Sequence, residues 1–69
     1  MTNVELLLGK LGAKRMSISA FAREMGFSRP TARRKVNGEV DFTVSEVTRA
    51  STLLGLSQEE MVNIFLRSK

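Results

Sequence analysis

The chain has 69 residues, a net charge of +4 and a hydrophobic content of 42%, which suits one globular domain over residues 1–69 and excludes a disordered tail. It contains neither cysteine nor histidine, so disulfides, Cys/His zinc sites and histidine-based catalysis are excluded. The longest apolar run near its start, Leu6–Leu8, is far too short for a signal peptide or a membrane span, and we expect a cytoplasmic protein that does not contact membranes.

The first predicted helix begins near Thr2 and ends at Gly12. Thr2 and Glu5 have the spacing of a capping box, in which two side chains bond to the unpaired N–H groups of a helix start. Apolar residues then recur at helical spacing, at Val4, Leu7, Leu8 and Leu11. Gly12 follows as a residue at which the helix can stop.

A second helix is predicted after Ser17, which is a favourable N-cap residue. Its expected apolar face consists of Ile18, Phe21, Ala22 and Met25. Gly26 follows where a helix end requires a left-handed backbone. Only two residues separate this helix from a third, predicted over residues 28–37. A short glycine-containing turn between two short helices is typical of a helix-turn-helix, here about residues 17–37.

The third predicted helix carries much of the basic charge. Ala32 and Val36 define its buried face, and Arg34 points almost directly away from that face. Arg33 and Lys35 flank the buried stripe on opposite sides, where their aliphatic stems can cover apolar surface while the charges stay in water. A plain solvated basic face is the alternative interpretation of these charges.

Two more capping boxes predict a fourth and a fifth helix. Thr43 and Glu46 begin the fourth, which Gly55 ends, and Ser57 and Glu60 begin the fifth. The expected apolar residues of these helices are Val44, Val47, Ala50, Leu53, Leu54, Met61, Ile64 and Phe65. No segment shows sustained two-residue alternation, so we predict an all-α fold of five short helices.

Positive charge is concentrated in one half of the chain. Residues 1–38 contain eight basic and two acidic residues, a net charge of +6. Residues 39–69 contain three basic and five acidic residues, a net charge of −2. This asymmetry favours a polyanionic partner such as nucleic acid.

Two segments resemble a known family. SISAFAREMGFSRPTARRKVNG resembles the helix-turn-helix of the lambda repressor and Cro superfamily, and DFTVSEVTRASTLLGLSQEEMVNIF resembles the last two helices of small phage-encoded Cro-like repressors. The sequence departs from the family pattern at three positions. Members often have glutamine at the position of Ile18, a polar residue at that of Pro30 and an aliphatic residue at that of Lys35. The resemblance implies a lambda-repressor-like fold and a sequence-specific transcriptional regulator of double-stranded DNA, acting in a bacterial or phage-infected cell.

The resemblance also implies which residues contact an operator. Helix 28–37 would enter the major groove, where arginine suits guanine because its guanidinium bonds to O6 and N7 together. The family's base-contacting positions correspond to Arg29, Pro30 and Arg34. Thr31 and Arg33 lie beside them and are expected to reach a base, with a phosphate as the alternative. Its phosphate-contacting positions correspond to Ser17, Ser19 and Asn37, and we expect Ser28 and Lys35 to contact phosphates as well. Outer phosphate contacts, or plain solvation, are expected for Lys10, Lys14 and Arg15. No cofactor or small-molecule ligand is implied.

Other functions compete with this interpretation. The acidic residues are scattered and mostly at helix caps, and no glycine-rich phosphate loop occurs, so we do not expect an enzyme. A protein-interaction module, such as an antitoxin or an anti-repressor with a repurposed helix-turn-helix, is the main alternative, but it would not need three arginines and a lysine on one helix. RNA binding is disfavoured because the four phenylalanines occupy core-like or turn positions, which offer no stacking platform.

The last helix predicts a homodimer, at least on DNA. A single helix-turn-helix reads only a few base pairs, and a two-fold dimer places two such units roughly 34 Å apart, one turn of DNA. Met61, Ile64 and Phe65 form one apolar stripe, and Val62 and Leu66 form a second. We expect a dimer interface at Val62, Phe65 and Leu66; the alternative is that Val62 and Leu66 are isolated exposed residues.

Overall fold

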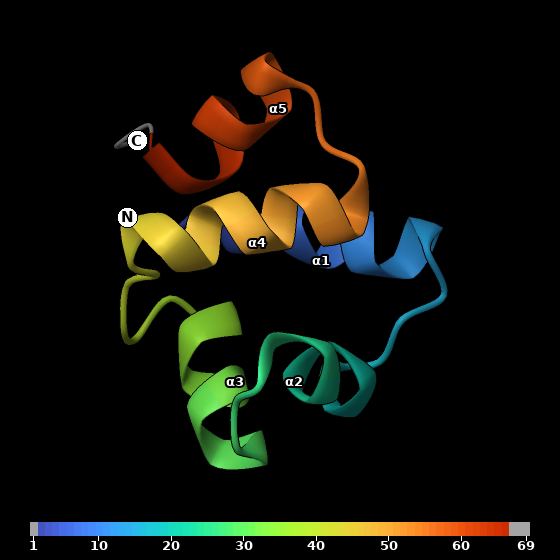
Figure 1. Ribbon diagram of the computed structural model, residues 1–69, viewed down its shortest axis with the longest axis vertical. Helices are drawn as coiled ribbons and strands as arrows, with labels where there is room; N and C mark the ends of the chain where they lie inside the picture. Colours follow the sequence, from blue (N-terminus) through green and yellow to red (C-terminus); the bar gives the residue numbers. More distant parts are fainter. Residues whose placement is uncertain (1, 67–69) are drawn as a thin grey trace.

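The computed structural model describes residues 2–66, which form helices and no strand within that range (Figure 1). The helices are α1 (Val4–Ala13), α2 (Ile18–Met25), α3 (Arg29–Val36), α4 (Val44–Leu54) and α5 (Gln58–Met61), and α5 continues directly into the π-helical turn η1 (Val62–Leu66). α2 packs against α3 and α4, and α1 packs against α3 and η1. The predicted all-α class and five helices are confirmed.

Side chains at the helix starts explain where most helices begin. The N-caps of α2 to α5 are Ser17, Ser28, Thr43 and Ser57. Both predicted capping boxes of α4 and α5 are complete. The capping box predicted for α1 was wrong: Asn3 is its N-cap and accepts a hydrogen bond from the Leu6 N–H at 3.1 Å, while Thr2 is buried. An asparagine caps a helix at least as well as a threonine, so the nearer residue takes this role.

The end of α1 also differs from the prediction. The helix passes through Gly12 to Ala13, and the left-handed residue that closes it is Arg15, at φ 54°. The Met16 N–H bonds to the Leu11 carbonyl at 2.9 Å across this turn. This hydrogen bond closes the helix although the left-handed position, which favours glycine, is occupied by Arg15.

Arg15→Gly is expected to raise the free energy of unfolding by about 1 kcal/mol relative to Arg15→Ala. Only glycine adopts the left-handed conformation without a steric cost, and both variants lose the same charge. The Arg15 side chain is exposed, so neither variant removes core packing. Thermal denaturation of the two variants measures the difference, and equal stabilities would contradict the backbone explanation.

The core is built from α1, α2, α3, α4 and η1. Its buried residues include Leu7, Leu11, Phe21, Met25, Val36, Val47, Ala50, Leu54, Ile64 and Phe65. Two residues expected on apolar faces are exposed, Leu8 by 44% and Val44 by 82%. Leu8 is rotated about 100° from its buried neighbour, and Val44 is the first residue of α4, ahead of the part that contacts the core.

Four phenylalanines connect the α2–α3 unit to the rest of the domain. The Phe21 ring is fully buried and makes edge-on contacts with Phe27 and Phe42 at centroid distances of 6.4 and 6.3 Å. Phe42 in turn contacts Phe65 at 5.0 Å. Such edge-to-face pairs contribute beyond their buried area. The prediction that these rings serve the core and the turn is confirmed.

The last helix changes its backbone form at Val62. The wider π-turn lets the consecutive residues Ile64 and Phe65 both face the core, where both are buried. Phe65, which was predicted to lie at a dimer interface, is therefore inside the monomer. Val62 stays half-buried and Leu66 is 57% exposed.

Candidate nucleic-acid interface

The turn between α2 and α3 has the predicted glycine geometry. Gly26 is left-handed, with φ 79° and ψ 22°. The Phe27 N–H bonds to the Ala22 carbonyl at 2.8 Å and closes the turn. A side chain at position 26 would meet no atom within 4 Å, so the backbone conformation, and not a lack of space, favours glycine here. The two helices are thus held at a fixed angle by a tight turn.

One side of α3 is buried and the other displays arginine. Ala32 and Val36 are fully buried, as predicted, and Arg34 on the opposite side is exposed. Arg29 and Arg33 are exposed as well. We call these three exposed arginines, together with the exposed Pro30 beside them, the basic face. The sequence predicted this face because two small apolar residues suffice to orient the helix.

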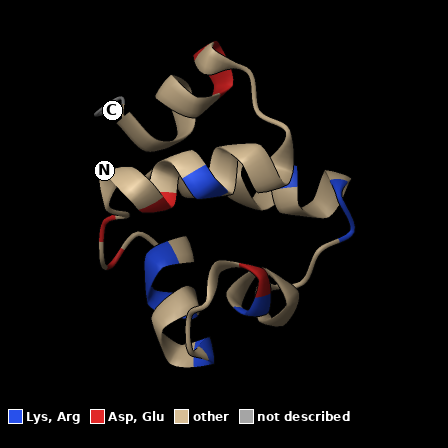
Figure 2. Cartoon of the chain, viewed as in Figure 1, with Lys and Arg blue, Asp and Glu red and all other residues tan. Residues whose placement is uncertain are grey.

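The charges of the basic face are not neutralised within the described chain. Between residues 2 and 66 the ion pairs are Lys10–Glu60 and Lys35–Glu46, so no carboxylate there pairs with an arginine of α3. Figure 2 shows basic segments on α3 and acidic segments on α5, at opposite ends of the view. Neither α2 nor α3 has an acidic residue in its first turn, whereas α1, α4 and α5 do. The partial positive charge of those two helix starts therefore adds to the arginines.

Several predicted phosphate-contacting side chains are exposed and have donors available. Ser17 Oγ accepts the Ala20 N–H at 3.0 Å, which leaves its hydroxyl hydrogen free to donate. Ser19 is exposed in the first turn of α2, and Asn37 is exposed at the end of α3. Ser28 is different, because its hydroxyl is used within the helix start.

The first turn of α3 forms its own hydroxyl pair. Ser28 Oγ accepts the Thr31 N–H at 3.3 Å and donates to Thr31 Oγ1 at 2.9 Å. Thr31 is half-buried, and its own hydroxyl hydrogen can still donate outward. Ser28 thus shapes the helix start, while Thr31 retains a donor near the basic face.

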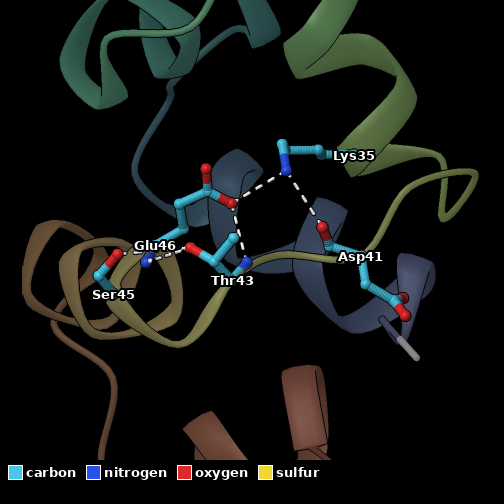
Figure 3. Close-up of polar contacts among 5 residues, drawn as sticks. All are labelled: Lys35, Asp41, Thr43, Ser45 and Glu46. Carbon is cyan, nitrogen blue, oxygen red and sulfur yellow. Dashed lines mark hydrogen bonds and ion pairs between the residues drawn. The ribbon is translucent and has the colours of Figure 1, made fainter.

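Lys35 lies away from the basic face and inside the domain. It was predicted to contact phosphate, but its side chain is only 10% exposed. Its ammonium lies 2.9 Å from a Glu46 carboxylate oxygen and 3.1 Å from the Asp41 carbonyl oxygen (Figure 3). It also lies 5.5 Å from the Phe27 ring centroid and 5.7 Å from that of Phe42. Both hydrogen bonds that the ammonium donates go to other parts of the domain, one to the segment before α4 and one to α4 itself. Lys35 therefore joins α3 to α4.

One of the outer basic residues is paired within the domain, and a second lies beside the end of α4. Lys10 forms an ion pair with Glu60. The Lys10 hydrogen bond and the Ser57 N–H hold the pKa of Glu60 below its ordinary value. The Lys14 ammonium lies near Gly55, 3.7 Å from where a side chain at that position would begin, and a cation suits this carboxyl end of α4.

Two other kinds of site are not found in the described range. No helix of residues 2–66 is long and apolar enough to span a membrane. In the same range, no three His, Cys, Asp or Glu side chains are grouped as metal ligands. The notable surface feature of this range is the basic face.

No protein-family model matches the chain, and no curated protein matches it. The resemblance to the lambda repressor and Cro superfamily thus rests on the sequence segments quoted above. A functional assignment must therefore be argued from the geometry and charge of the basic face.

Proposed function

We propose that the protein is a sequence-specific transcriptional regulator, a Cro-like repressor of the phage type, that binds double-stranded DNA through α3. The observation that supports this most is the basic face, where Arg34 lies opposite buried Ala32 and Val36 and all three arginines are exposed without a carboxylate partner among the described residues. An α-helix fits the major groove, and arginine is the side chain that most often reads guanine there. The protein acts in the cytoplasm of a bacterial or phage-infected cell.

The side chains divide into two groups in this proposal. The residues that approach base edges are Arg29, Pro30, Thr31, Arg33 and Arg34. The residues that hold phosphates are Ser17, Ser19 and Asn37. The start of α2 adds its N–H groups and partial positive charge to the phosphate contacts. Lys35 is left out of the second group because its ammonium is bonded within the domain.

Selection from a pool of random double-stranded DNA tests this proposal. The wild type should enrich a short motif with G·C pairs at positions that arginines read. A variant with Arg29, Arg33 and Arg34 replaced by alanine should enrich no motif. If the wild type also enriches nothing above non-specific binding, the protein-interaction module becomes the better assignment.

Operator affinity should fall with salt concentration. Lys14 and Arg15 are the exposed cationic side chains proposed for outer phosphates. Each phosphate that such a side chain neutralises releases condensed counterion, so these two contacts give a logarithmic slope of about −1.8 and a roughly 12-fold loss over a fourfold rise in salt. Asn37→Ala removes a neutral phosphate contact, and it should weaken binding without changing this slope. Fluorescence anisotropy over a salt series measures both quantities, and a nearly flat plot would contradict an electrostatic interface.

The homodimer on DNA is part of this proposal. The contact between Phe42 and Phe65 brings the segment before α4 next to η1. On either side of this contact, Val44 and Leu66 expose apolar side chains to solvent. A second copy of the chain would cover this end of the molecule, with Val62 and Leu66 as contact residues.

Leu66→Asp should weaken association of two protomers on the operator at least tenfold. Burying a leucine at an interface contributes about 1.5 kcal/mol or more, and an aspartate there would be desolvated without a partner. Val40→Asp is the control, since Val40 is an apolar residue of similar exposure, 45% against 57% for Leu66, in the loop between α3 and α4. Sedimentation with and without operator measures assembly, and a wild type that binds one protomer at a time like Leu66→Asp would rule out this interface.

A further inference from the structure

Few residues attach α3 to the rest of the domain. Its buried residues are Ala32, Lys35 and Val36. Alanine and valine are small, so they mark the buried side of α3 but contribute few of the contacts that resist a small rotation about its axis. The third attachment is a charged group, which would be costly to bury without partners. The contacts of Lys35 are therefore a large part of what fixes this helix.

The ammonium of Lys35 is bound from several directions. A carboxylate oxygen of Glu46 and the carbonyl oxygen of Asp41 accept its hydrogen bonds at 2.9 and 3.1 Å. The rings of Phe27 and Phe42 lie within 6 Å of it, a distance at which an aromatic face attracts a cation. The group is thus fixed in position relative to both the turn before α3 and the segment before α4.

Glu46 is held as firmly as its partner. The oxygen that bonds to Lys35 also accepts the Thr43 N–H at 2.9 Å, and Thr43 Oγ1 accepts the Glu46 N–H at 3.2 Å (Figure 3). Burial alone would raise the pKa of Glu46, but the Thr43 N–H and the Lys35 ammonium outweigh it and leave the pKa below its ordinary value. The carboxylate is therefore charged at neutral pH, and the cap of α4 is tied directly to α3.

Lys35 is adjacent to the residues that the proposed function places in the groove. Successive side chains on an α-helix are separated by about 100°, so fixing Lys35 fixes the directions of Arg34 and Arg33 as well. A guanidinium reads a base edge only in a narrow range of positions, because both of its hydrogen bonds must be aligned. A small roll of α3 would therefore cost base contacts before it cost phosphate contacts.

We propose that Lys35 and Glu46 are positioning residues, whose ion pair sets the rotation of α3 and so determines sequence specificity without touching DNA. This inference rests on the proposed function. Its decisive variant is Lys35→Met with Glu46→Gln. The double change leaves no unpaired charge in the interior, and the glutamine can still accept the Thr43 N–H.

The first measurement compares operator and non-specific DNA. In the double variant the ratio of operator to non-specific affinity should fall at least tenfold, while non-specific affinity and its salt slope change less than twofold. A ratio within twofold of wild type overturns the inference. An equal loss on both DNAs also overturns it, because that pattern belongs to a phosphate contact or to partial unfolding. Circular dichroism under the binding conditions confirms that the variant is folded.

The second measurement needs no DNA. Amide hydrogen exchange of α3, taken relative to that of α2 in the same sample, should be at least tenfold faster in the double variant than in wild type. An unchanged exchange ratio overturns the positioning role. If wild type selects no DNA motif, the proposed function fails by itself, and this exchange ratio still decides whether the pair fixes α3.

Discussion

Phe21→Ala is expected to lower the free energy of unfolding by about 3–5 kcal/mol. Phe21 is fully buried on α2, and its ring contacts Phe27 in the turn and Phe42 before α4. Removing it leaves a cavity at the point where the α2–α3 unit meets α4. A domain of this size has a total stability of only about 3–10 kcal/mol, so the variant should be largely unfolded at physiological temperature.

The matched control for this change is Val44→Ala. Val44 is also apolar, but it is 82% exposed, so its truncation should change stability by less than about 0.5 kcal/mol. Chemical denaturation of both variants gives the two free energies. Similar losses at the two positions would show that the phenylalanine cluster is not the centre of the core.

The helix starts could be predicted because capping is local chemistry. Ser17, Ser28, Thr43 and Ser57 each lie within three residues of the N–H they accept, so their spacing alone identifies them. The ends of α1 could not be predicted in this way. Two adjacent residues, Thr2 and Asn3, can both cap, and the choice depends on how the chain enters the domain, where the Asn3 N–H bonds to the Ile64 carbonyl at 2.7 Å.

The basic face could be predicted and the role of Lys35 could not. Ala32 and Val36 orient α3, and this determines the direction of Arg34 from sequence. The partner of Lys35 is eleven residues away on another helix, and no local pattern connects the two. The one available signal was that Lys35 stands where the resembling family often has an aliphatic residue, which indicates a buried position. The apolar pattern placed Phe65 in one stripe with Met61 and Ile64, but it gave no signal for the change to a π-turn at Val62.

Arg34→Ala is expected to weaken operator binding by about 1–3 kcal/mol and to relax specificity at one base pair. Arg34 lies opposite the buried Ala32 and Val36 and is therefore the arginine of α3 directed furthest from the core. It has no ion-pair partner among the described residues. If it pairs with O6 and N7 of one guanine, its loss removes discrimination at that position only. Binding to non-specific DNA should fall much less.

Arg49→Ala is the control that separates base reading from charge. Arg49 is exposed on α4, a different helix from the one that carries the basic face, and its replacement changes the net charge by the same amount. Affinities are measured for both variants on the selected operator, on operators with each base pair changed, and on non-specific DNA. Arg34→Ala should lose its preference at a single pair, whereas Arg49→Ala should keep the wild-type pattern at every pair. If Arg34→Ala weakens operator and non-specific DNA by the same factor, Arg34 contacts a phosphate, and Arg29 or Arg33 must carry the reading of the base.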